Sequence, residues 1–70
     1  MTTKNGVDVP AELAEALKGR PALKETFERM SAACQREYLQ WIDEAKRAET
    51  RLKRIEGTLT GIADWGERHP

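Results

Sequence analysis

The chain has 70 residues, of which 39% are hydrophobic and 34% charged, and its 12 basic and 12 acidic side chains give a formal net charge of zero. These values predict one small folded domain, and they disfavour general nucleic-acid binding, which usually needs a basic excess. The single cysteine excludes an internal disulfide and a cysteine-rich zinc site, and no apolar run approaches the roughly 20 residues of a membrane span.

The first part of the chain predicts a flexible tail followed by a short helix. Residues 1–8 are polar and resemble neither a helix nor the apolar part of a signal peptide, so we expect a cytoplasmic protein with a mobile start. Pro10 suits the first helical position, because its missing N–H would have no helical partner there. A helix over residues 10–18 places Leu13 and Leu17 on one face.

The next segment repeats this pattern and predicts a second short helix over residues 21–30. Pro21 opens it, and Leu23, Phe27 and Met30 follow at positions i, i+4 and i+7 of one stripe.

A third helix is predicted over residues 32–46. Ser31 precedes it and is a favourable N-cap residue, because its hydroxyl can accept a hydrogen bond from a free backbone N–H. The apolar side chains of this helix share one face, which we expect to be buried. They are Cys34, Tyr38, Trp41, Ile42 and Ala45.

A fourth helix is predicted over residues 49–65, since apolar side chains recur with a spacing of 4, 3, 4 and 3. They are Ala48, Leu52, Ile55, Leu59 and Ile62. One continuous helix from residue 32 would leave this stripe exposed, so we expect a break near Arg47 and a helical hairpin. The residues 66–70 predict a second flexible tail.

Gly57 and Gly61 lie four positions apart inside the fourth helix. In one interpretation they only weaken its distal half, because each glycine costs about 1 kcal/mol relative to alanine. In the other, they allow a neighbouring helix to approach closely.

These elements predict an all-α fold in a single domain over residues 9–65. We expect a compact bundle of about four helices, in which the two short N-terminal helices pack on the hairpin of the third and fourth.

The sequence contains no glycine loop for phosphate and no histidine-based metal motif, so we expect no catalytic residue, no cofactor and no metal. Cys34 lies in the first turn of a helix, which would lower its thiol pKa somewhat, but its place on the apolar stripe favours a small core residue. His69 is expected to be a tail residue. An enzymatic use of Asp43, Glu44 or Glu49 is a weak alternative, since no nucleophile–base pair accompanies them.

Charged residues are dense between positions 41 and 56. Asp43 precedes Arg47 by four positions, and Glu49 precedes Lys53 by four. Both pairs have the order that stabilises a helix by about 0.3–0.5 kcal/mol. Salt bridges of this kind would explain much of the charge in this stretch.

Arg47, Arg51 and Arg54 form a further row at i, i+4 and i+7, and the last two have no obvious local partner. Guanidinium groups match carboxylates and phosphates well, so the row is a candidate site for an acidic protein surface or an anionic ligand. Two alternatives stay open. The row binds nucleic acid, or these arginines and Glu49 form ion pairs that only fix the turn between the third and fourth helices.

The sequence resembles the YdeI/OmpD-associated family, also called the bacteriocin-protection family, over roughly residues 7–63. The resemblance rests on "WI" at 41–42, "AK" at 45–46 and "ETRLKRI" at 49–55. It implies a small all-helical module, often found after a small β-rich domain, with no established catalytic residues. It also implies a link to porin association and to resistance against bacteriocins or cationic peptides.

We therefore expect a non-enzymatic interaction module that docks a protein, or an anionic ligand, through a polar cluster between the third and fourth helices. Nucleic acid is a less favoured partner, and self-association is also expected of so small a core, with Leu39, Leu59 and Trp65 as candidates for an exposed patch. The six residues of this junction cluster are Lys46, Arg47, Glu49, Thr50, Arg51 and Arg54.

Overall fold

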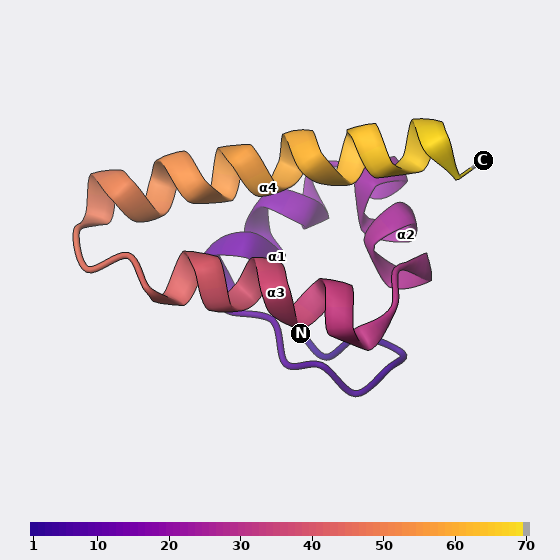
Figure 1. Ribbon diagram of the computed structural model, residues 1–70, viewed down its shortest axis with the longest axis horizontal. Coiled ribbons are helices and arrows are strands. Elements are labelled where there is room, and N and C mark those ends of the chain that lie inside the picture. Colours follow the sequence, from indigo (N-terminus) through magenta and orange to yellow (C-terminus); the bar gives the residue numbers. More distant parts are fainter. Residues whose placement is uncertain (70) are drawn as a thin grey trace.

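A computed structural model describes residues 1–69 of the chain, and these form four helices and no strand. The helices are α1 (Ala11–Lys18), α2 (Pro21–Arg29), α3 (Ala32–Asp43) and α4 (Ala48–Arg68). Figure 1 shows α4 running the length of the molecule, with α3 roughly antiparallel beside it. The predicted all-α bundle of about four helices is confirmed.

The boundaries of α3 follow from local capping. The Ser31 hydroxyl accepts a hydrogen bond from the backbone N–H of Cys34 at 3.1 Å, as a Ser N-cap should. α3 ends at Asp43, three residues before the predicted end. Arg47 is the extended residue that precedes α4, so the predicted break near Arg47 is confirmed.

α4 is the common partner of the other helices, since it contacts α1, α2 and α3. Buried side chains from all four helices meet along it, with Leu13, Leu17 and Phe27 fully enclosed. The members of this core are Val9, Leu13, Leu17, Phe27, Met30, Ile42, Ile55, Leu59 and Ile62. The core therefore lies between α4 and the two short helices, closed on one side by α3.

The buried face of α4 differs from the predicted stripe at its first turns. Ile55, Leu59 and Ile62 are buried as the spacing predicted, but Leu52 is 58% exposed. The burial of Leu59 means that its suggested place in an exposed patch was wrong. Thr58 takes a fully buried place instead, and its hydroxyl donates to the Arg54 carbonyl at 2.8 Å, so no buried polar group is left without a partner there. The prediction of a buried Leu52 was wrong because Leu52 lies about 80° from Ile62 and about 120° from Thr58 around the helix axis, at the edge of the buried face.

The two helical glycines of α4 lie directly under aromatic side chains of α3. A Cβ on Gly57 would come within 3.0 Å of Trp41, and a Cβ on Gly61 within 2.9 Å of the Tyr38 ring carbon that bears the hydroxyl. The close-approach interpretation is thus confirmed. Trp41 nevertheless keeps 41% of its surface exposed, so its predicted core position was wrong.

Residues 1–9 fold back on the α2–α3 connection. Thr3 and Gln35 are both buried, and the Thr3 hydroxyl donates to the Gln35 side-chain oxygen at 2.9 Å. The Gln35 amide donates in turn to the carbonyls of Phe27, at 2.7 Å, and Met30, at 3.3 Å. The expectation of a flexible tail over residues 1–8 anticipated none of these contacts.

α4 continues to Arg68, three residues beyond its predicted end. After it, the His69 ring stacks on Trp65 with 4.2 Å between ring centroids. An Arg29 side-chain N–H donates to the His69 carbonyl at 3.3 Å. Pro70, the last residue of the predicted second tail, lies outside the described residues.

Candidate interaction surface at the α3–α4 junction

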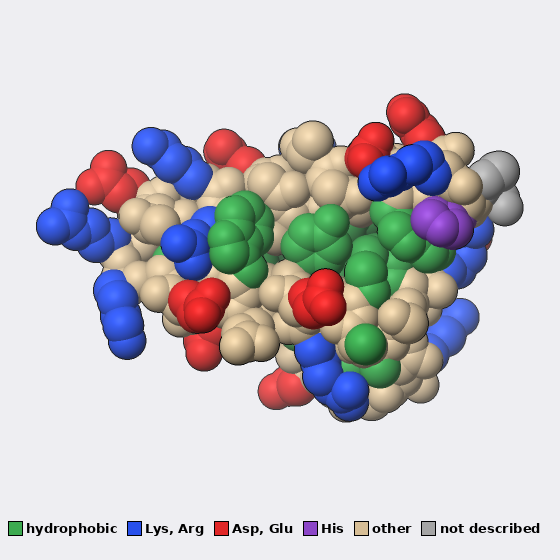
Figure 2. Space-filling model, viewed as in Figure 1, with side chains coloured by type: hydrophobic (Ala, Val, Ile, Leu, Met, Phe, Trp, Pro, Cys, Tyr) green, Lys and Arg blue, Asp and Glu red, His purple; other side chains and the backbone are tan. Residues whose placement is uncertain are grey.

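The six residues of the junction cluster lie around the bend between α3 and α4, at one end of the molecule, but they differ in exposure. Lys46, Arg47 and Glu49 are exposed, whereas Thr50 is partly buried. Figure 2 shows hydrophobic side chains in a row along the seam between α3 and α4, with basic side chains at the end where these helices join.

Arg51 joins three helices. Its Nε donates to the Glu12 carboxylate of α1 at 2.9 Å. Its Nη1 lies 3.2 Å from the Ile42 carbonyl oxygen and 3.5 Å from that of Ala45, at the end of α3. The last carbonyls of a helix have no partner within it, so the guanidinium closes this end of α3.

The pairing of Arg51 with Glu12 also shifts the pKa of both groups. The hydrogen bond from Arg51 lowers the pKa of the Glu12 carboxyl below its ordinary value. The same hydrogen bond raises the pKa of Arg51. Each charge therefore stabilises the charged form of the other.

Arg54 makes a second contact of this type. Its Nη1 donates to the Trp41 carbonyl at 2.6 Å, and its guanidinium carbon lies 5.4 Å from the centroid of the Trp41 ring. The backbone and the ring of Trp41 are thus both held by one side chain of α4. The Arg54 guanidinium thus forms a cation–π contact with the Trp41 ring and a hydrogen bond with a carbonyl in the last turn of α3.

The two helical salt bridges expected from spacing do not occur within residues 1–69. Asp43 is the last residue of α3 and Arg47 lies outside the helix, so their four-residue separation no longer places them on one helical face. Glu49 and Lys53 share α4 but form no ion pair. Glu12, the actual partner of Arg51, lies 39 positions away, where sequence spacing carries no signal.

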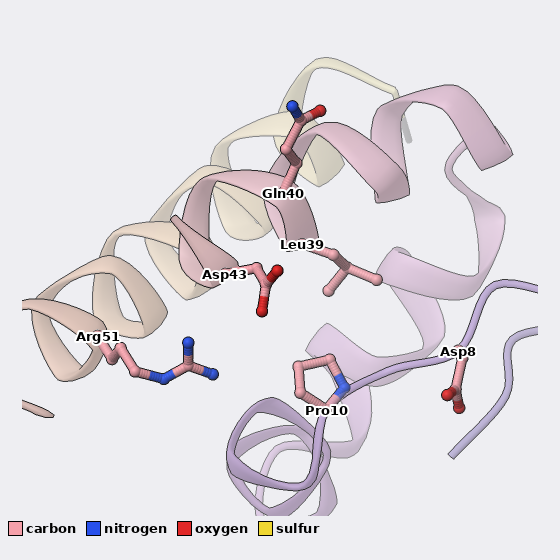
Figure 3. Close-up of a pocket in the computed structure, with 6 residues that line it drawn as sticks. All are labelled: Asp8, Pro10, Leu39, Gln40, Asp43 and Arg51. Carbon is pink, nitrogen blue, oxygen red and sulfur yellow. The ribbon is translucent and has the colours of Figure 1, made fainter. Parts of the chain in front are cut away.

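A depression of about 370 Å³ lies next to this junction, between α3 and the start of α1. In Figure 3 the side chains of Arg51 and Asp43 point towards it, and Pro10 and Leu39 form its apolar part. It holds no histidine, cysteine or hydroxyl that could act as a nucleophile. No group of three metal-ligating side chains occurs in the described part of the chain.

Cys34 and His69, the other two residues considered for a chemical role, lie outside this depression. Cys34 is packed against the core, and burial raises the pKa of its thiol, with a smaller contribution from Glu37. The lowered pKa expected from its place in the first turn of α3 was therefore wrong. His69 lies at the far end of α4 from the junction.

The sequence of this chain matches the model of a known protein family over most of its length. The sequence model of the family described as "Bacteriocin-protection, YdeI or OmpD-Associated" matches residues 6–64. The chain belongs to this family. The matched part of this YdeI/OmpD-associated module contains α1 to α3, most of α4 and the whole junction cluster, so the resemblance seen in the sequence is confirmed.

Further comparisons with the YdeI/OmpD-associated module gave no additional relative: neither the curated proteins nor the solved structures contain a match to it. None of the helices in residues 1–69 of the module combines the length and the apolar character of a bilayer span.

Proposed function

We propose that this member of the YdeI/OmpD-associated family is a non-enzymatic interaction module that docks a protein partner through the α3–α4 junction. One observation carries the proposal: Trp41 exposes 41% of its surface near the junction, although contacts with two residues of α4 hold its ring and its backbone in place. Gly57 lies under its ring, and Arg54 holds its backbone carbonyl.

An exposed but immobilised tryptophan is well suited to binding. Trp and Arg are enriched among the residues that dominate interface energies, usually as well-packed anchors. Because the Trp41 ring is already oriented by Gly57 and Arg54, a partner would lose less side-chain entropy on contact than it would with a mobile side chain.

The exposed charges nearby supply the second part of the surface. Lys46 and Arg47 are exposed, and neither takes part in a salt bridge within the described residues. Positively charged side chains at the rim of an interface mainly raise the rate of association and favour partners of opposite charge. An acidic protein surface is therefore the favoured partner, and an isolated anionic group is the simpler version of the same chemistry.

The contacts of the arginine row weigh against the nucleic-acid alternative. Arg51 and Arg54 donate to carbonyl groups of α3, which leaves Arg47 as the member of the row without such a contact. The same contacts favour a structural role for Arg51 and Arg54.

Within the family, the physiological role that we propose for this docking is bacteriocin protection, and a cytoplasmic location stays a prediction.

Photo-cross-linking in cells tests the proposal, with a photoreactive residue at position 41 of the full chain. We expect one cross-linked protein, whose binding to the purified chain is lost on Trp41→Ala and on the double change Lys46→Glu with Arg47→Glu. The charge-reversal variant should keep the wild-type Tm, because Lys46 and Arg47 are exposed. Trp41→Ala loses the packing of the ring on Gly57 and Arg54, so its binding is measured at a temperature at which circular dichroism shows it folded.

The matched control reverses two exposed lysines on the short helices, Lys18→Glu with Lys24→Glu. It changes the net charge by the same amount and should not affect binding. Equal loss of binding in the control and the junction variant would overturn the proposal, as would a partner that binds the Trp41→Ala variant normally.

A further inference from the structure

We propose that the flank of α4 that carries Leu52 is a contact surface between two copies of this chain. Leu52 is the most exposed of the large hydrophobic side chains, at 58%. Leu52 forms one wall of an apolar depression of about 410 Å³, with Ala16, Ala48 and Ile55, and the Glu12–Arg51 ion pair lies at its edge. A protruding leucine and a receptive groove thus share one surface.

The exposure of Leu52 follows from its direction on α4. Leu52 lies about 80° from Ile62 and about 120° from Thr58 around the helix axis. Both of those side chains are fully buried, so Leu52 stands at the edge of the buried face. There it lies beside Glu12 and Ala16 of α1, which line the same depression without covering it.

This surface is separate from the proposed docking site. Leu52 and Gly57 are five residues apart on α4, so their directions differ by about 140° around the helix axis. Trp41 packs on the Gly57 side. One molecule can therefore contact a second copy through Leu52 and still present Trp41 to another protein.

A second depression continues the same flank towards the C-terminal half of α4. Its apolar part is formed by side chains of α2 and α4, with one basic and one acidic residue at its edge. The lining residues are Arg20, Leu23, Glu56, Leu59, Thr60 and Ala63. Two separate depressions thus lie along this flank of α4, one beside Leu52 and one beside Leu59.

Two features indicate that a second copy of the chain binds this surface: its suitability for two-fold symmetry and the pattern of its charges. In a two-fold dimer the same patch faces itself, so it must contain both the protruding side chain and the groove that receives it. The exposed charges around Leu52 also alternate in sign: Glu49, Lys53 and Glu56. A two-fold axis level with position 51, on the side of α4 that faces away from the Arg51 side chain, places Glu49 opposite Lys53 of the other copy, and does so twice.

The overall charge favours the same occupant. The net charge of the chain is zero, so two copies approach each other without mutual repulsion. A partner with strongly charged flanks of one sign would meet both attractive and repulsive groups on this rim.

Sedimentation of the full chain from about 1 µM to about 1 mM tests the proposal. We expect a reversible monomer–dimer equilibrium, whose dissociation constant rises about tenfold or more on Leu52→Ala, because each copy loses one buried apolar contact. Leu52→Glu should give a monomer. Both variants should keep the wild-type circular dichroism spectrum, since Leu52 is mostly outside the core.

Charge exchange tests the orientation. Glu49→Lys and Lys53→Glu should each weaken the dimer, and the double variant should regain most of the loss. Trp41→Ala, on the other flank of α4, should leave the dissociation constant within about twofold.

A monomer throughout this concentration range would overturn the inference, as would a dimer that is insensitive to Leu52→Glu. Binding of a different protein to the Leu52 flank of a monomeric chain would overturn it too. These outcomes are distinct from failure of the proposed function, which depends on Trp41, Lys46 and Arg47.

Discussion

The side chain of Arg51 donates to the carboxylate of Glu12 across 39 positions of sequence, and the same guanidinium reaches the carbonyls of Ile42 and Ala45. One residue of α4 thereby fixes the first helix and the end of the third. The contact links the short N-terminal helices to the hairpin at the end of the molecule where the candidate interaction surface lies.

Arg51→Ala should lower the Tm more than Glu12→Ala. The arginine change removes the ion pair and also the hydrogen bonds to the Ile42 and Ala45 carbonyls, whereas the glutamate change leaves those hydrogen bonds in place. Thermal denaturation of both variants checks this order, with Arg47→Ala as an exposed control that should resemble wild type. Equal losses for Arg51→Ala and Glu12→Ala would contradict the role of Arg51 at the end of α3.

The Glu12–Arg51 pair should contribute to stability only above acidic pH. Hydrogen bonding to Arg51 lowers the folded-state pKa of Glu12 below its unfolded value, so the folded form favours the ionised carboxylate. The resulting stability is complete above the ordinary glutamate pKa of about 4.3 and is lost as the pH falls through the lower folded pKa. Denaturant unfolding of wild type and Glu12→Gln at several pH values should show a difference that disappears in acid. A difference that persists unchanged at low pH would exclude this origin.

Gly61→Ala should destabilise the fold by about 1–3 kcal/mol, because the added methyl group meets the Tyr38 ring. Gly57→Ala is the matched control. Its methyl group meets only the outer edge of the Trp41 ring, at 3.0 Å, which a displacement of a few tenths of an ångström relieves, while the helix gains up to about 1 kcal/mol of propensity. Chemical denaturation measures both. In a Tyr38→Ala background, Gly61→Ala should become neutral or stabilising, and persistent destabilisation there would refute the steric explanation.

Thr3→Val should cost about 2 kcal/mol or more. The Thr3 hydroxyl donates to Gln35 and accepts from the Val7 N–H at 3.1 Å, so its removal leaves two buried polar groups without a partner. Thr2→Val is the control, since Thr2 is exposed and surface substitutions usually change stability by less than about 0.5 kcal/mol. If the two variants unfold at the same denaturant concentration, residues 1–9 do not belong to the cooperative unit.

Cys34 should react slowly with thiol reagents in the folded chain. Burial raises the pKa of its thiol, and the thiolate is the reactive form. The rate of modification at pH 7, measured with and without denaturant, should rise on unfolding. A folded-state rate equal to or above the unfolded rate would point to an activated cysteine instead.

The helices and their breaks were predictable because their determinants are local. Pro21 and Ser31 mark helix starts through their own backbone and hydroxyl chemistry, which acts over three or four residues. The apolar spacing of α4 likewise identified Ile55, Leu59 and Ile62 as core. The same reasoning could not say how wide the covered face of α4 would be, and it therefore placed Leu52, at the edge of that face, inside.

The contacts of the junction cluster were not predictable, because they depend on the fold. Arg51 and Arg54 appeared to lack partners when only neighbouring positions were considered. Their partners are a carboxylate on α1 and carbonyl oxygens of α3, and carbonyl oxygens have no residue-specific signal in a sequence. Trp41 was placed in the core for a related reason, since its spacing matches the apolar stripe whether or not another helix covers its outer face.

The position of α4 in the chain has a consequence for biosynthesis. α4 is the last of the four helices to be made, yet each of the other three packs on it. A nascent chain that ends before Ala48 has α1 and α2 in contact but has no surface on which they and α3 can share a core. The bundle therefore completes its folding only once most of α4 has left the ribosome, and until then its apolar residues remain accessible to chaperones.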